Sequence, residues 1–288
     1  MKLIDLYNSV VKHGQIADPR QRKGISYEDT AILYGKPSTQ VKKILVGIDI
    51  EVGEILLADR LRQKQGLDLV IAHHPEGRAW ANFYEVMILQ VDLLVKAGVK
   101  RSVAEKMLSE RMSEVERRVL PNNHMRSVDV ARILDIPFMC MHTPADNQVA
   151  KFLGNIFKKQ KPKRLKDVVG LLNEIPEYKD ASKNGTGPRV IAGSPNAFSG
   201  EILMEMTGGT EGPKEALGKL YKAGVRTLVS MHTSEEHFKK AKEFNLNVVI
   251  AGHISSDTLG LNLLLDKIEK EEKLSIISCS GFRRISRL

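Results

Sequence analysis

Short apolar runs alternate with amphipathic stretches through most of the chain. Ile44–Ile50 (ILVGIDI) and Leu67–Ile71 are apolar enough to be buried strands, and Glu51–Gln65 between them has the pattern of a helix. A strand, a helix and a strand within about 30 residues predict a βαβ unit with parallel strands. Later apolar runs of this kind are residues 136–141, 190–193, 227–231, 247–251 and 274–279. The pattern predicts an α/β fold with mainly parallel strands.

The stretches between these runs are expected to be helices and loops. Residues 3–13 place apolar side chains on one helical face, whereas residues 18–34 are polar, contain glycine and proline, and are interpreted as a loop. Ala81–Leu120 is helical in pattern, and Gly98 divides it into two helices. This helical pair could cover a site or form a subunit interface, and the pattern does not separate the two. The basic cluster Lys158–Lys166 is interpreted as a solvated linker between domains.

Composition is that of an ordinary globular protein, with 42% hydrophobic and 27% charged residues in a chain of 288. No run approaches the ~18 apolar residues of a membrane span, and the N-terminus is too polar for a signal peptide. Cys140 and Cys279 lie in apolar runs and cannot make a disulfide framework, so we expect buried, inert thiols and a cytoplasmic protein. The net charge of +9 could favour nucleic acid, but the basic residues are scattered and 5% aromatic residues disfavour a base-stacking platform.

Two adjacent histidines, His73 and His74, follow the run Leu67–Ile71 and precede Pro75. Adjacent side chains diverge where a strand ends, so these two would point in different directions from nearly the same place. That arrangement suits two neighbouring metal ions better than one. The alternative is a polar strand end with two ordinary loop histidines.

Polar side chains with ligand chemistry follow other apolar runs in the same way. The predicted parallel strands would bring their carboxyl ends, and with them these side chains, to one edge of the sheet. Asp146 alone could instead cap a helix that starts near Gln148. Imidazole and carboxylate together suit Zn, Fe, Mn or Ni, and two such ions could share a carboxylate and keep positions open for water. The residues concerned are Asp49, His142, Asp146, His232, His253 and Asp257.

Three segments of the chain together resemble the Ngg-interacting-factor-three-like family. They are DLVIAHHP, HTPADN and AGHISSD, and they correspond to the family's His-His pair, its His-Thr-x-x-Asp segment and its Gly-His-x-x-x-Glu segment. By that resemblance the metal ligands are His73, His74, Asp146, His253 and Asp257. Asp257 stands where the family has a longer Glu, which leaves open whether the second metal site fills.

The resemblance also implies an architecture and an activity. It implies two α/β domains, with a C-terminal segment that returns to the first, and a toroidal homohexamer with metal sites facing its interior. We expect residues 1–150 and 250–288 to form the metal-site domain, with a helical insertion at about 78–134, and residues 151–249 to form the second. Members are described as type 2 homologues of GTP cyclohydrolase I, which points to a nucleotide-like substrate.

We therefore expect a metal-dependent hydrolase that acts on a nucleotide or a related compound. His142 or His232 would transfer protons, and Arg78 near the mouth of the site could hold phosphate. The alternative is a metal-binding scaffold or regulator without catalysis. Nucleic-acid binding is the third and weakest interpretation.

Overall fold

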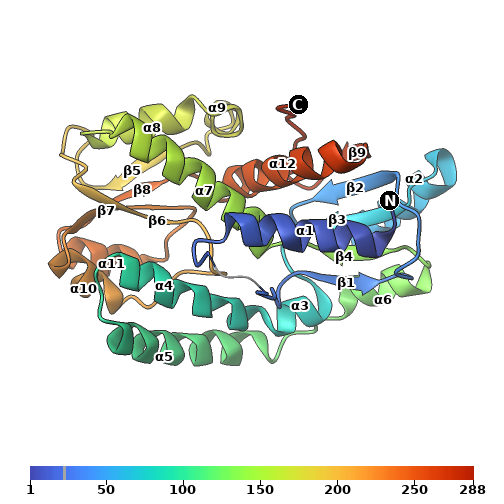
Figure 1. Ribbon diagram of the computed structural model, residues 1–288, viewed down its shortest axis with the longest axis horizontal. Helices are drawn as coiled ribbons and strands as arrows, with labels where there is room; N and C mark the ends of the chain where they lie inside the picture. The colour runs from blue at the N-terminus through green and yellow to red at the C-terminus, as the bar shows by residue number, and fades with distance from the viewer. Residues whose placement is uncertain (22–23) are drawn as a thin grey trace.

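The structure, a computed structural model, describes residues 1–21 and 24–288, and within them the strands form two sheets (Figure 1). The five-stranded sheet has the order β1-β4-β3-β2-β9 and the four-stranded sheet the order β5-β8-β7-β6. The strands are β1 (Ala31–Tyr34), β2 (Lys43–Gly47), β3 (Leu69–Ala72), β4 (Phe138–Cys140), β5 (Arg189–Ala192), β6 (Glu201–Glu205), β7 (Val225–Ser230), β8 (Asn247–Ile250) and β9 (Ser275–Ser278).

Both sheets are mixed and mostly parallel, as the sequence predicts. In the first sheet β2 pairs in parallel with β3 and β9, and β3 with β4, while β1 is antiparallel to β4. In the second sheet β7 is parallel to β6 and β8, and β5 is antiparallel to β8. The C-terminal strand β9 joins the first sheet, which confirms the expected return of the chain.

Helices cover both faces of each sheet. Cores on the two faces of the first sheet include residues of α1 and α12 on one side and of α2 and α6 on the other. The second sheet packs against α7, α8 and α9 on one face, and against α10 and α11 on the other. The helices are α1 (Leu3–Ala17), α2 (Val52–Gln65), α3 (Gly77–Ala81), η1 (Phe83–Ile88, a 3₁₀ helix), α4 (Leu89–Lys96), α5 (Arg101–Val119), α6 (Arg126–Ile133), α7 (Thr143–Gln160), α8 (Leu165–Asn173), α9 (Pro176–Lys183), α10 (Ala216–Lys222), α11 (Glu235–Glu243) and α12 (His253–Glu271).

Helices η1, α4 and α5, which follow the His-His pair, belong to the core of the second sheet. Apolar residues of η1, α4 and α5 share one buried cluster with α10, α11 and strands of the second sheet. In Figure 1, α4 and α5 run side by side along one edge of the molecule, from the first sheet toward the second. Gly98 separates them with φ +94, as predicted. This segment therefore bridges the two sheets.

The two long helices α7 and α12 cross closely between the sheets. Ala145 and Leu261 belong to the core of the first sheet, whereas Val149 and Leu259 belong to that of the second. A Cβ atom on Gly260 would lie 2.6 Å from the carbonyl oxygen of Ala145, so only glycine lets the helices approach this far. The close contact at Gly260 therefore sets how near the two helices lie to each other.

Some local expectations were wrong. Residues 31–34, interpreted as loop, form strand β1, and residues 22–23 of that stretch lie outside the described part of the chain. Helix α7 begins at Thr143 and not near Gln148, so Asp146 lies inside its first turn and is not its cap. Strand β6 and helix α9 had no counterpart in the sequence interpretation. None of the helices in the described residues is long and apolar enough to cross a membrane.

Candidate metal centre

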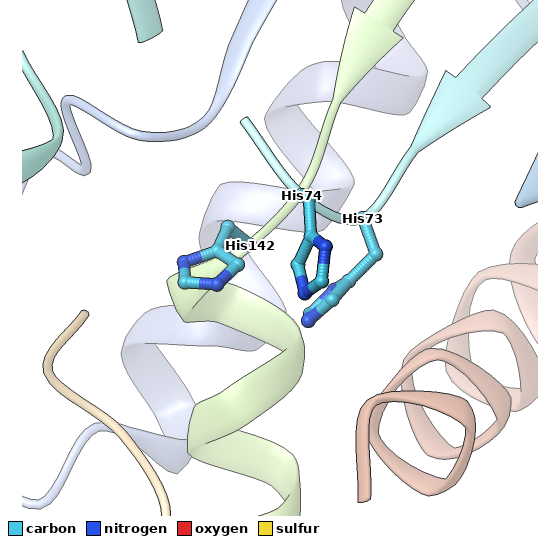
Figure 2. Close-up of side chains that lie close together, drawn as sticks. All are labelled: His73, His74 and His142. Carbon is cyan, nitrogen blue, oxygen red and sulfur yellow. The ribbon is translucent and has the colours of Figure 1, made fainter. Parts of the chain in front are cut away.

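The His-His pair lies just beyond the end of β3. The backbone N–H groups of His73 and His74 still donate to the carbonyls of Gly47 and Ile48, both at 2.9 Å, so β2 and the residue after it hold the pair in place. The two rings are tilted by 42° with centroids 5.4 Å apart; His73 is fully buried and the side chain of His74 is 25% exposed. Figure 2 shows both rings converging with that of His142, which comes from the start of α7. The expected divergence of the two side chains is therefore wrong, because Nε2 of both histidines faces the carboxylate of Asp257 at 3.4 Å.

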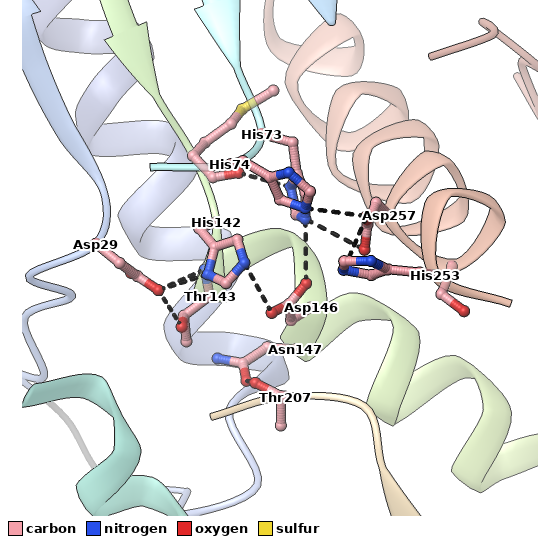
Figure 3. Close-up of polar contacts among 12 residues, drawn as sticks. Asp29, His73, His74, His142, Thr143, Asp146, Asn147, Thr207, His253 and Asp257 are labelled. Carbon is pink, nitrogen blue, oxygen red and sulfur yellow. Dashed lines mark hydrogen bonds and ion pairs between the residues drawn. The ribbon is translucent and has the colours of Figure 1, made fainter. Parts of the chain in front are cut away.

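Helices α7 and α12 bring the carboxylates to the pair. Asp146 lies in the first turn of α7, which directly follows β4. His253 is the first residue of α12 and Asp257 lies one turn later, so both side chains face the same side (Figure 3). Because β8 of the second sheet leads into α12, the cluster joins the carboxyl ends of strands from both sheets.

The carboxylate of Asp257 lies at the middle of the cluster. Its Oδ1 is 3.4 Å from Nε2 of His73, and its Oδ2 is 3.4 Å from Nε2 of His74 and 3.6 Å from Nε2 of His253. Asp146 Oδ1 is 3.5 Å from Nε2 of His73. The structure thus brings together all five residues that the resemblance implies as ligands.

The other ring nitrogen of three histidines is occupied by a fixed partner. Nδ1 of His73 contacts the carbonyl of Met141 at 3.2 Å, Nδ1 of His74 contacts Oδ1 of Asp49 at 2.6 Å, and Nδ1 of His142 contacts Oδ2 of Asp29 at 2.8 Å. Metal-binding histidines commonly donate their second N–H to a carbonyl or carboxylate in this way. The arrangement leaves each Nε2 directed at the cluster.

Unsatisfied buried atoms gather here. Among the described residues, the buried side-chain N and O atoms that lack a hydrogen-bond partner are Nε2 of His73, Oδ1 of Asp146 and Oδ2 of Asp257. Leaving such atoms unpaired costs about 1–3 kcal/mol each. Two ligand atoms bound about 2.1 Å from one tetrahedral ion lie about 3.4 Å apart, close to the separations observed. A buried His/Asp cluster that could bind metal ions is therefore present.

Three overlapping groups in the cluster have ligand atoms within 4.8 Å of one another. Asp257 belongs to two of the groups. The groups are His73, Asp146 and Asp257; His74, His253 and Asp257; and His73, His74 and His142.

The electrostatic environment of the cluster favours the binding of positive charge. Burial opposes protonation of the imidazoles, but the carboxylates outweigh it and raise the pKa of His73 to about 10 and that of His74 to about 9. Burial also opposes ionisation of Asp257, yet the surrounding histidines hold its pKa below the usual range. The hydrogen bond from His74 lowers the pKa of Asp49. Protons or metal ions can supply the positive charge that these carboxylates require.

The two histidines predicted to transfer protons occupy different surroundings. His142 is 5% exposed, its Nε2 is 3.8 Å from Oδ2 of Asp146, and it belongs to a potential ligand group. His232 follows β7 and is exposed, with its ring edge against that of His253 at 4.8 Å between centroids. Both line one cavity of about 440 Å³ beside the cluster.

Sequence reasoning missed Asp29. Its carboxylate is fully buried and accepts hydrogen bonds from His142 and from Oγ1 of Thr143 at 2.6 Å. It comes from the stretch interpreted as a loop, and its partners lie more than a hundred residues away, so no local pattern indicated it. Arg78 also differs from expectation, because its guanidinium donates to the carbonyl of Ile32 at 3.2 Å and the cavity is lined by Arg126 instead.

Comparison with known proteins gives a clear answer at the level of fold. No family model matches the sequence, and no curated protein does. A NIF3 superfamily protein from Sphaerobacter thermophilus is 26% identical and superposes with a TM-score of 0.81 over 98% of each chain. The chain has the NIF3 superfamily fold.

Other solved structures share this fold. Reduced HcgD from Methanocaldococcus jannaschii is 15% identical, with a TM-score of 0.55 over 96% of this chain and 97% of its own. A protein from Thermus thermophilus is 16% identical, with a TM-score of 0.52 and full coverage of both chains. At these identities the likeness concerns the fold alone. The family resemblance inferred from the histidine segments is confirmed, together with a buried His/Asp cluster suited to metal.

Proposed function

We propose that this protein binds two divalent metal ions and acts as a metal-dependent hydrolase on a nucleotide or a related compound. The observation that carries the proposal is the convergence of three unpaired buried atoms, from His73, Asp146 and Asp257, at one point between the sheets. Such atoms are destabilising unless a further partner completes the site.

The proposed ions would divide the cluster in two. His73 and Asp146 would hold one ion, and His74 and His253 the other. Asp257 would bridge them, since Oδ1 faces His73 while Oδ2 faces His74 and His253. The start of α12 places this shorter carboxylate within reach of all three imidazoles, which supports its role in place of Glu.

The chemistry would follow from the open positions of such a site. A bound pair of divalent ions lowers the pKa of water and polarises a phosphoryl or carbonyl oxygen. His232, exposed on the cavity wall beside His253, is placed to exchange protons with solvent. His142 is tied to Asp29 and directed at Asp146, so positioning or metal binding suits it better than proton transfer. Ring opening of GTP is the specific reaction to test first.

A scaffold or regulatory role without catalysis is the second candidate. The observation that favours it is the fixed hydrogen bonding of His142, which leaves His232 as the one proposed proton carrier. For either role, a homohexamer is proposed on the family resemblance, and a cytoplasmic location on the two cysteines that cannot make a disulfide framework.

The test combines metal analysis with activity. Purified protein should contain two transition-metal ions per chain, and a nucleotide panel that includes GTP should show turnover. The double variant His73→Ala/His74→Ala should lose both, whereas His13→Ala, an imidazole that contacts Glu271 away from the cluster, should lose neither. Two ions without turnover would favour the scaffold, and no bound metal would refute both roles.

A further inference from the structure

One wall of the cavity beside the metal cluster is aromatic. Trp80 in α3 and Phe83 at the start of η1 both line the cavity, with ring centroids 5.2 Å apart. The Phe83 ring also lies 5.5 Å from that of His142, so the aromatic surface continues to the cluster. We call Trp80 and Phe83 the aromatic wall.

The aromatic wall is held rigidly. Phe83 is 6% exposed and belongs to the core shared by the bridging helices and the second sheet. A Cβ on Gly209 would meet Cζ of Phe83 at 3.4 Å, so the backbone of this glycine lies directly against the ring. Nε2 of Gln90 donates to the carbonyls of Gly208 at 2.7 Å and Thr210 at 2.6 Å and fixes that backbone. A wall fixed in advance loses little entropy when a ligand stacks on it.

Trp80 has a hydrogen-bond donor that no other described residue uses. It is half-buried at the cavity, and within residues 1–21 and 24–288 its indole N–H makes no hydrogen bond. Buried tryptophans usually have a partner for this group. Trp80 thus presents a ring and a free donor to a ligand or to water.

The rim of the same cavity carries a cation without an ion pair. Arg126 at the start of α6 lines the cavity, and among the described residues no carboxylate lies within ion-pair distance of it, although its charge partly offsets the rise that burial causes in the pKa of Glu76 on the same cavity. Asn123 and His124 lie beside it on the rim. A guanidinium in this position suits an anionic group, and phosphate above all.

We infer that the aromatic wall stacks against the heteroaromatic ring of a free nucleotide, while Arg126 pairs with its phosphate. A cavity of about 440 Å³ is of the size that binds small molecules, and one aromatic pair stacks a single ring, whereas a nucleic-acid strand needs several. The inference rests on the proposed function for its reaction, because the bond to be hydrolysed would face the cluster. Binding itself requires only the cavity.

The test uses Trp80 as its own reporter, because it is the single tryptophan of the chain. Nucleoside monophosphates, the matching nucleosides and ribose 5-phosphate are titrated into the full-length protein, both metal-loaded and after chelation. We expect saturable quenching of Trp80 fluorescence by nucleosides and nucleotides in both forms, and none by ribose 5-phosphate. No saturable quenching at millimolar nucleotide would overturn the inference.

Variants separate stacking from simple packing. Calorimetry should show about tenfold weaker nucleotide binding by Trp80→Leu, with Trp80→Tyr within a few-fold of the parent protein. Arg126→Gln should weaken binding of the nucleotide but not of the nucleoside. Phe198→Leu, at an aromatic residue that is 71% exposed and outside this cavity, should change neither.

The outcomes also distinguish this inference from the proposed hydrolase. Saturable quenching without turnover would refute hydrolysis and keep the nucleotide site. Turnover with an unchanged KM in Trp80→Leu would keep the hydrolase and refute the aromatic wall. Tighter binding of an oligonucleotide than of its monomer would also contradict the assignment to a free nucleotide.

Discussion

Two carboxylates at the carboxyl edges of the sheets, the buried Asp257 and the partly buried Glu205, have opposite electrostatic surroundings. At the first, Asp257 lies among three imidazoles that hold its pKa below the usual range despite burial. At the second, Glu205 ends β6 in a small cavity of about 60 Å³ that Asp146 and His232 also line, and burial together with Glu211 raises its pKa to about 7. The first edge thus has a buried carboxylate, Asp257, that attracts positive charge, whereas Glu205 at the second edge has no positively charged partner among the described residues. Neighbouring side chains, and not burial alone, decide which edge can hold metal.

The largest expected effect comes from removing the charge at the centre of the first edge. Asp257→Asn keeps the shape of the side chain but withdraws the carboxylate that faces His73, His74 and His253. We expect metal affinity to fall by at least about a hundredfold, because Asp257 would be a direct ligand in the proposed site and even outer-shell partners are worth 10–100-fold. Metal analysis and titration calorimetry would measure the loss. Asp59→Asn, at a surface carboxylate that pairs with Arg62, is the matched control, and retention of both ions by Asp257→Asn would refute the bridge.

A smaller effect is expected from the residue that orients His74. Asp49→Asn replaces the carboxylate that accepts the hydrogen bond from Nδ1 of His74 at 2.6 Å. The imidazole should lose basicity and orientation, and metal affinity should fall by about 10–100-fold. Competition with a chromogenic chelator would give this value. An affinity equal to that of the parent protein would mean that Asp49 is only a surface contact.

The helix crossing between the two edges should matter for stability as well as for metal. Gly260→Ala would place a methyl group 2.6 Å from the Ala145 carbonyl and force α7 and α12 apart. Overpacking of this kind typically costs 1–3 kcal/mol, so we expect about 2 kcal/mol of lost stability in urea denaturation and weaker metal binding. Gly170→Ala in α8, where a new Cβ meets nothing within 4 Å, should be neutral or stabilising by up to about 1 kcal/mol. Equal stability of the two variants would contradict the close crossing.

The smallest expected effect concerns the second edge and depends on pH. Because the pKa of Glu205 rises from 4.5 unfolded to about 7 folded, it stabilises the fold most below pH 4.5 and this contribution is lost as the pH rises toward 7. The side chain in Glu205→Gln cannot titrate. Between about pH 4.5 and 8, the free energy of unfolding of this variant should therefore fall by about 1–2 kcal/mol less than that of the parent protein. Urea denaturation of the chelated protein at both pH values would measure this difference. The exposed Glu201→Gln should behave like the parent, and parallel pH profiles for Glu205→Gln and the parent would refute the shift.

Much of the fold was predictable because its signals are local. Apolar runs bounded by polar residues identified most strands, and strand, helix and strand in close succession identified the parallel pairing of β2 and β3. Strand β6 was missed because none of its five residues is buried and they give no strong apolar run. The choice of sheet for α4 and α5 also has no local signal, since an apolar helix face fits either one.

The candidate site was predictable in its parts and less so in its assembly. Strand-end histidines indicated His73, His74 and His142 directly. The same strand-end pattern indicated His253, but it placed all of these strands in one sheet. The structure has β8 in the second sheet, and no spacing along the chain encodes how the two sheets face one another. Asp29 could not be predicted from the sequence. It lies just before the antiparallel edge strand β1, in a stretch with no periodicity, and only the pairing of β1 with β4 brings it to His142.

The late position of α12 has a consequence for biogenesis. A ribosome finishes His73, His74 and Asp146 well before it reaches His253 and Asp257, and strand β9, which lies beside β2, emerges later still. A nascent chain therefore offers incoming metal only a partial coordination sphere with one carboxylate in place. Loading of the proposed metal site is therefore expected to await translation of α12, because the full set of ligands exists only once both α7 and α12 have been synthesised.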